Sequence, residues 1–254
     1  MKRLFLVLAA LLALALAYVH WVLPGQVEAS KNVVLPLERY AISERAQQLH
    51  ASMFIADLHS DSLLWKRDLS RRSDIGHMDL PRLREGNVAL QVFSATTKSP
   101  AGLNYEENTA ESDQITLLAI ASFWPPRTWF SIYERAAFQL EKLHDLARRE
   151  DLVVITGAAD LQALAARRAR GEPVVGAVYL TEGAHPLEGD IDNLDRLFDQ
   201  GLRITGLTHF FDNELGGSLH GQSGQGLTGF GKAVVRRANE LGIIIDIAHA
   251  SPAM

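Results

Sequence analysis

The sequence is 254 residues long, 47% hydrophobic and 22% charged, with a formal net charge of -5. A chain of this length and composition can bury one sizeable core, and its mildly acidic balance, without a basic stripe, argues against nucleic acid as a partner. Because it has no cysteine, disulfides, thiolate metal sites and a cysteine nucleophile are excluded, and any metal must be held by His, Asp and Glu.

Residues 1–29 begin with two basic residues and continue with an apolar run from Leu4 to about Leu23. About twenty helical residues rise by roughly 30 Å, the thickness of one hydrocarbon core, and Trp21 suits the interface at its far end. We expect an N-terminal membrane anchor that leaves the rest of the chain outside the cytoplasm, in a periplasmic or extracellular location. The alternative is a signal segment cleaved near residues 27–29, which would release a secreted protein.

Residues 30–52 are typical of a linker followed by a short helix that Ser43 caps, and residues 53–254 alternate strand-like and helix-like segments. Strands are expected at 53–58, 88–93, 152–156, 174–181, 202–208 and 242–247, and helices at 106–123, 131–149, 159–170, 191–199 and 229–241. Several of these strands are apolar on both faces, which indicates a parallel sheet covered by helices. The pattern fits an open doubly wound sheet or a (β/α)₈ barrel, and no G-x-G-x-x-G follows the first strand to support a dinucleotide fold.

The first strand ends in IADLHSDSLLW, where His59 and Asp61 interrupt an apolar run. In an extended segment, residues i and i+2 point to the same side, so the imidazole and the carboxylate could hold one cation. The alternative is that Ser60 or Asp61 caps a helix and that the histidine is an incidental surface residue.

Three further strands end in side chains of the same kind: Glu182 ends the fourth strand, His209 the fifth and His249 the sixth. In parallel α/β barrels the carboxyl ends of the strands carry the active site. Together with His59 at the end of the first strand, four strands end in a side chain that can bind a metal. This coincidence predicts a metal site. No G-x-S-x-G or H-E-x-x-H motif occurs that would support a serine hydrolase or a helix-borne zinc protease.

The other histidines carry weaker signals. His77 and Asp79 in GHMDLPRL repeat the His-x-Asp spacing but precede a strand, so we assign them a structural role. His185 and His220 follow the fourth and fifth strands, and we expect them near the rim of the site without assigning them a function.

The chain resembles the membrane dipeptidase (renal dipeptidase) family of zinc metallopeptidases, within the metallo-dependent hydrolases, over about residues 40–254. The resemblance depends on the order and spacing of five segments: DLHSDSLL, HMDLPRLREGNVALQVFS, YLTEGAHPL, GLRITGLTHFFDNELGGS and GIIIDIAHAS.

The resemblance implies a (β/α)₈ TIM-barrel-type metallo-dependent hydrolase with two zinc ions. His59 and Asp61 would bind the first ion, Glu182 would bridge both ions, and His249 would bind the second, while His209 would contact the substrate. Two ions sharing a carboxylate lower the pKa of a bridging water, and the resulting hydroxide would attack the peptide bond of a small dipeptide, including dipeptides with a C-terminal D-residue.

The family pattern continues beyond Met254 with further strands and ligands, so we expect about six of eight βα units and a barrel incomplete at its C-terminus. By itself this chain should bind at most one zinc firmly and hydrolyse poorly. Alternatives are hydrolysis of another small amide or lactone by the same barrel superfamily, or a non-catalytic membrane-tethered remnant. The sequence leaves a homo-oligomer open.

Overall fold

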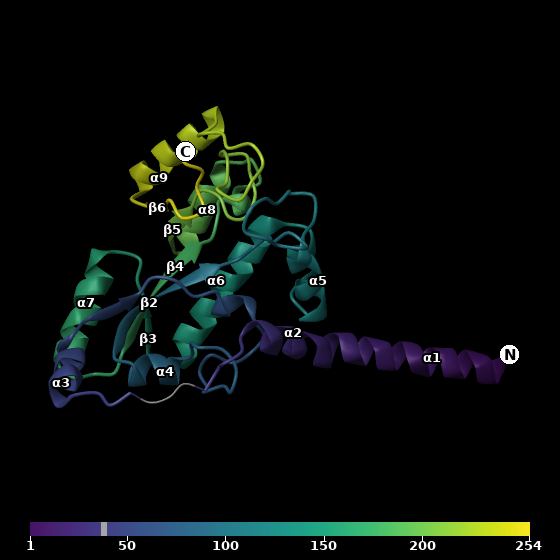
Figure 1. Ribbon diagram of the computed structural model, residues 1–254, viewed down its shortest axis with the longest axis horizontal. Coiled ribbons are helices and arrows are strands. Elements are labelled where there is room, and N and C mark those ends of the chain that lie inside the picture. Colours follow the sequence, from purple (N-terminus) through teal and green to yellow (C-terminus); the bar gives the residue numbers. More distant parts are fainter. Residues whose placement is uncertain (37–39) are drawn as a thin grey trace.

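A curled sheet of parallel strands forms the centre of the computed structural model, which describes residues 1–36 and 40–254 (Figure 1). Five strands follow one another in the sheet: β1 (Ile55–Asp57), β2 (Val88–Ala95), β4 (Val175–Thr181), β5 (Leu202–Gly206) and β6 (Ile244–Asp246). The sixth, β3 (Leu152–Val154), pairs with the first residues of β4. All of these pairings are parallel, as the two-sided apolar runs predicted.

Strand β3 does not lie between β2 and β4, where a series of strands in chain order would place it. One edge of β4 is occupied by β2, so the short β3 and β5 share the other edge, at opposite ends of β4. Strands β1 and β6 lie at the two ends of the sheet, which is therefore an open arc. Apolar side chains at these ends are exposed, among them Phe54, Leu58, Ile244 and Ile247. The six strands thus form part of the circumference of the predicted barrel.

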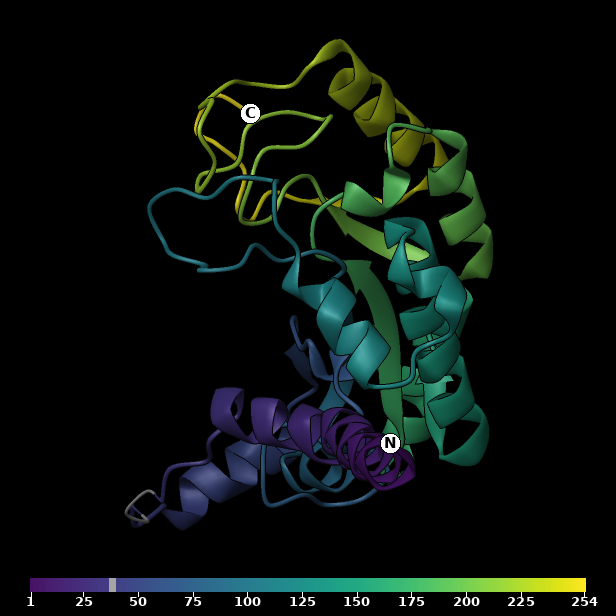
Figure 2. The same cartoon turned by 90° about the vertical axis from the view of Figure 1, so that its right-hand side faces the viewer.

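Most helices pack on one face of the arc (Figure 2), and the other face is covered only in part and has an open hollow lined by Leu90, Val178 and Ile204. The helices around the sheet are α3 (Glu44–Ser52), α4 (Leu80–Glu85), α5 (Gln114–Ala121), α6 (Ile132–Arg149), α7 (Ala158–Ala169), α8 (Asp192–Gln200) and α9 (Gly229–Leu241), with short turns η2 (Ser62–Leu64), η3 (Pro126–Trp129) and η4 (His185–Leu187). The main core joins α6 and its neighbours to one face of β4 through residues such as Leu140 and Tyr179, whose hydroxyl donates to the Ala136 carbonyl at 2.6 Å. Leu164 of α7 packs near Val178 in a separate cluster.

Local sequence signals explain several helix boundaries. Ser43 caps α3 and Ser131 caps α6, each accepting a backbone N–H three residues further on at 3.2 Å. The helix predicted over 106–123 is shorter, because α5 begins only after Asp113, whose side chain accepts the Ile115 N–H at 3.0 Å.

The N-terminal segment is one long helix, built from α1 (Lys2–Ala17), the π-helical turn η1 (Tyr18–Val22) and α2 (Leu23–Lys31). It is 30 residues long, with a mean hydropathy of 2.4 in its most apolar window, which is enough to cross a membrane by length and composition. Figure 1 shows α1 projecting away from the domain. The linker predicted after the apolar run begins later than expected, because α2 continues to Lys31 and buries Pro24 and Glu28. Residues 37–39 of that linker lie outside the described residues.

Candidate metal centre

His59 and Asp61 follow β1 at the carboxyl edge of the sheet, on the same side of the chain as the sequence predicted. His59 Nε2 lies 3.4 Å from Asp61 Oδ2, and both side chains are accessible, with 42% and 37% of their surface exposed. Asp61 also precedes the turn η2, but its side chain makes no capping hydrogen bond there. The helix-cap alternative therefore lacks its defining contact.

Glu182 follows β4 and lies at the centre of the site. Its Oε1 atom is approached by three imidazoles, with His209 Nε2 at 3.3 Å, His249 Nε2 at 3.4 Å and His59 Nε2 at 3.5 Å. These side chains form two overlapping groups whose ligand atoms lie within 4.8 Å of one another: His59, Asp61 and Glu182, and Glu182, His209 and His249. The structure therefore brings together all five residues that the sequence singled out.

The loops after β5 and β6 fix the two remaining histidines. The carbonyl of His249 accepts the Thr208 hydroxyl at 3.0 Å and the Leu219 N–H at 2.8 Å, which ties the two loops together. His249 has a φ of 63°, a left-handed conformation that is uncommon for a residue with a side chain and that turns its ring toward Glu182. The rings of His209 and His249 meet edge to face at 4.8 Å.

The pKa values of three candidate ligands indicate which of them are in a form that binds a metal. Burial acts to raise the pKa of Glu182, but the hydrogen bond with His249 and the nearby His209 and His59 imidazoles outweigh it and hold the pKa at about 2. The hydrogen bond that His59 donates to Asp61 raises the pKa of His59 to about 9, so this imidazole is protonated near pH 7. Burial lowers the pKa of His209 to about 4, which keeps this imidazole neutral. Glu182 and His209 are therefore in the forms that bind metals, an ionised carboxylate and a neutral imidazole, whereas His59 would have to lose its proton to bind one.

The spacing of the donor atoms fits a metal ion. Separations of 3.3–3.5 Å around Glu182 Oε1 are longer than good hydrogen bonds. Zinc bonds of about 2.0–2.1 Å in a tetrahedral arrangement place neighbouring ligand atoms about 3.3–3.4 Å apart. Among the described residues, the Nδ1 atoms of His209 and His249 have no hydrogen-bond partner, and it is the Nε2 atoms of both rings that face Glu182.

Sequence reasoning missed Thr96, which directly follows β2 at the same edge of the sheet. Its hydroxyl lies 3.0 Å from Asp61 Oδ1 and 3.0 Å from Glu182 Oε2, so it links the two candidate carboxylates. The signal that could have found it was its position, since it ends the second strand as His59 ends the first. Asp246 was also missed; it ends β6 and lines the cavity with His59.

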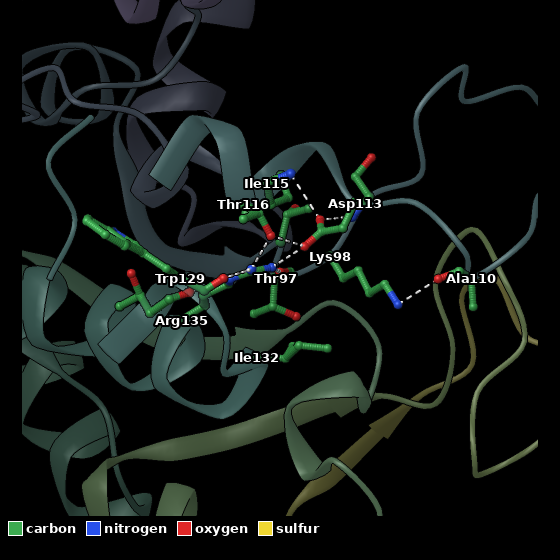
Figure 3. A network of polar contacts seen from close by, with 12 residues as sticks. Thr97, Lys98, Ala110, Asp113, Ile115, Thr116, Trp129, Ile132 and Arg135 are labelled. Atoms are coloured by element: carbon green, nitrogen blue, oxygen red, sulfur yellow. Dashed lines mark hydrogen bonds and ion pairs between the residues drawn. The ribbon is translucent and has the colours of Figure 1, made fainter. Parts of the chain in front are cut away.

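Helix α6 holds the segment that carries Thr96. Gln139 donates to the Thr96 carbonyl at 3.1 Å. Arg135, only 2% exposed, donates to the Thr97 carbonyl at 2.9 Å and to Asp113 Oδ2 at 2.5 Å, while Lys98 donates to the Ala110 carbonyl at 2.8 Å (Figure 3). This network joins both ends of the long β2–α5 connection to the core, so the Thr96 hydroxyl has a fixed position.

A cavity of about 240 Å³ opens beside the cluster, lined by residues that include His59, Glu182, Gly183, Asp246 and His249. A larger hollow of about 550 Å³ lies elsewhere, beside Arg67 and Lys142, and none of the candidate ligands lines it. We place the site at the smaller cavity because the donor atoms converge there.

The other histidines take different places. His185 is 4% exposed and packs on Phe211 at a ring distance of 4.5 Å, so it lies in the core rather than at the rim. His220, also buried, has its Nδ1 2.6 Å from the Tyr105 carbonyl, and its ring is 5.1 Å from that of His249. Asp79 is fully buried and caps α4, which confirms its predicted structural role.

Fold and site together define a partial parallel α/β barrel with metal-type ligands at its carboxyl edge, and several solved structures share the fold. The metallopeptidase dipeptidase AC is 24% identical with a TM-score of 0.57, over 80% of this chain and 59% of that one. A metallopeptidase from Rhodobacter sphaeroides, liganded with a phosphinate mimic of the dipeptide L-Ala-D-Ala, is 24% identical with a TM-score of 0.57, over 79% and 60%. The probable dipeptidase PvdM from Pseudomonas aeruginosa is 19% identical with a TM-score of 0.59, over 81% and 49%.

Residues 43–254 match the model of the membrane dipeptidase family, peptidase family M19, and the chain belongs to that family. This confirms the predicted family, and the solved structures confirm the barrel-type fold. The chain spans about three fifths of the length of the first two solved structures that it matches.

Proposed function

We propose that this chain is the barrel portion of a zinc-dependent dipeptidase that is anchored to a membrane by its N-terminal helix. Membership of the membrane dipeptidase family supports a metallopeptidase, and the convergence of three imidazoles on one carboxylate oxygen at 3.3–3.5 Å supports the metal. That convergence is the observation that carries the proposal.

His59 and Asp61 would hold a first zinc ion, His249 a second, and Glu182 would bridge both. We assign His209 to the substrate beside the scissile bond, although its Nε2 lies as close to Glu182 as that of His249. A His209→Ala variant separates the two roles. Loss of metal would make His209 a ligand, whereas loss of hydrolysis with metal retained would make it a substrate contact.

The zinc ions, when bound, would lower the pKa of a water and polarise the scissile carbonyl. The protein's own residues prepare that chemistry. Glu182 stays ionised because its pKa is about 2, and Thr96 keeps it aligned with Asp61. His209 is neutral near pH 7 and 4% exposed, so it can offer a hydrogen bond inside a site with little water. A cavity of about 240 Å³ suits a small substrate such as a dipeptide.

We also propose that the N-terminal helix is a retained anchor and that the barrel lies outside the cytoplasm. The helix passes directly into α2, whose Glu28 is 3% exposed against the domain. Cleavage at residues 27–29 would cut through this packed segment. The two basic residues at the start of the chain favour the cytoplasmic side for the N-terminus.

The first test is zinc content by elemental analysis of the full chain in detergent, after chelation and reloading. We expect bound zinc in the wild type and its loss in Glu182→Gln, with Glu214→Gln, an exposed carboxylate in the β5–α9 loop, as the matched control. Equal zinc in all three proteins would refute the site.

Hydrolysis of L-Ala-D-Ala, a small lactone and a small cyclic amide by the zinc-loaded chain then separates the functions. Preference for the dipeptide supports the dipeptidase, and preference for either other substrate supports a related hydrolase. Because this chain by itself is expected to hydrolyse poorly, Glu182→Gln sets the background rate of the assay. Zinc binding with no hydrolysis above that background would favour the non-catalytic alternative for this chain.

A further inference from the structure

The end of the candidate membrane span rests against the tip of α5. His20 Nδ1 lies 3.2 Å from the Ala121 carbonyl, and its ring stacks on Phe123 at a centroid distance of 4.1 Å and an angle of 21°. The ring of Trp21 lies 5.6 Å from that of Phe123. A residue of the domain is therefore fixed at the level of the last turns of the span.

The length of the apolar run sets the depth of this contact. From Leu4 to Trp21 a helix rises by about 26 Å, close to the roughly 30 Å of a hydrocarbon core. If the run crosses a bilayer, Trp21 reaches the far interface, and Phe123 lies beside it at the same depth. Indole and phenyl rings are favourable in that layer.

Phe123 is unusual among the described residues because its backbone has a φ of 59° although its side chain is bulky. Such a left-handed conformation is costly for a residue of this type. The side chain is nevertheless 52% exposed, while the adjacent Trp124 is 4% exposed. The backbone therefore turns one aromatic residue outward beside the span. Lys66 Nζ lies 5.3 Å from the Phe123 ring centre and adds a cation to the same surface.

The packing of α2 prevents the domain from swinging away from the span. Glu28 Oε1 is 2.8 Å from Arg67 Nε, and the two side chains are 4% and 9% exposed. Gly76 N–H donates to the carbonyl of Asn32, just past the helix, at 2.8 Å. These contacts hold the part of the helix that follows Pro24, whereas the His20 contact holds the part that precedes it.

We propose that His20, Trp21, Lys66 and Phe123 form an interfacial cluster that seats the catalytic domain directly on the phospholipid surface, with the aromatic rings at the headgroup boundary and Lys66 among the phosphates. The inference rests on the proposed membrane anchor and adds to it a fixed contact between the domain and the lipid. A domain tethered by a flexible linker would have no such contact.

The absence of native cysteine allows a direct test by single labelling. An environment-sensitive fluorophore is attached to Leu12→Cys, Lys66→Cys, Phe123→Cys or Gln162→Cys in the full chain. Each protein is reconstituted in phosphatidylcholine–phosphatidylglycerol vesicles that carry a nitroxide either on the headgroup or near the bilayer centre. Position 162 on α7, at the side of the domain opposite to α2 in Figure 1, is the aqueous control.

We expect the bilayer-centre nitroxide to quench position 12, and the headgroup nitroxide to quench positions 66 and 123 by roughly half, with position 162 unaffected. Quenching at position 12 without quenching at positions 66 and 123 would refute the contact between the interfacial cluster and the lipid, but would still support the membrane anchor. No quenching at 12 would overturn both. Position 66 reports on the cluster if Phe123→Cys fails to fold.

Discussion

Replacing Glu28 with Gln tests whether the end of the N-terminal helix belongs to the folded domain. Glu28 lies on α2 and pairs with Arg67 at 2.8 Å, with both side chains nearly buried. Arg67 also donates to the Ser62 hydroxyl at 3.3 Å, one residue from the candidate ligand Asp61. The substitution keeps the size of the side chain and leaves a buried guanidinium without its counter-charge.

The expected cost follows from the burial of the pair. Burial of Glu28 outweighs its attraction to Arg67 at 2.8 Å and raises the pKa of Glu28 above its usual range, so each charge in this pair depends on the other for compensation. Removing one partner of a buried pair typically costs about 3–5 kcal/mol. For a domain of this size, that corresponds to a decrease in melting temperature of roughly 6–20 °C.

Thermal unfolding in detergent measures this decrease. Glu85→Gln is the matched control, because it breaks an ion pair with Arg72 whose side chains are 62% and 54% exposed. Such an exposed pair contributes at most about 1 kcal/mol. Glu28→Gln/Arg67→Met should regain part of the loss, since it removes the uncompensated charge. A Glu28→Gln melting temperature equal to that of the control would show that α2 is not packed on the domain.

Three further predictions concern single side chains. Thr96→Val keeps the shape of the residue but removes the hydroxyl between the two carboxylates, so zinc affinity should decrease by roughly 10–100-fold at an unchanged melting temperature; titration against a competing chelator measures it, and unchanged affinity would contradict the role. Gly183→Ala should lower both stability and zinc binding, because φ is +81° and a Cβ would lie 2.5 Å from His185 Nδ1 and 3.1 Å from His209 N; a normal melting curve would contradict this. Burial lowers the pKa of Lys142 to about 8, so the unfolded chain binds more protons between about pH 8 and 10.5, and the free energy of unfolding should rise with pH across that window. Lys142→Met should remove this rise. If the free energy of unfolding changed with pH in the same way in both proteins, Lys142 would not be its cause.

Much of the fold was predictable because its signals are local. The helix predicted at 229–241 is observed as Gly229–Leu241, and the strands expected at 88–93 and 202–208 are observed within two residues. The expected helix from residue 106 failed because Asp113, held by Arg135, starts the helix later. The position of β3 also depends on pairing with β4, which no local pattern encodes.

The sequence by itself determined five side chains that the structure brings together at the candidate site, but not Thr96 or Asp246. Parallel strands end at one edge of a sheet, so His59, Glu182, His209 and His249 had to gather there once their strands were recognised. The tertiary structure decided how they meet. The convergence of three imidazoles on one oxygen of Glu182, the link through Thr96 and the packing of Glu28 on Arg67 all join segments far apart in the sequence. Periodicity indicates which face of an element is buried, but only three-dimensional packing fixes which atoms come within bonding distance across elements.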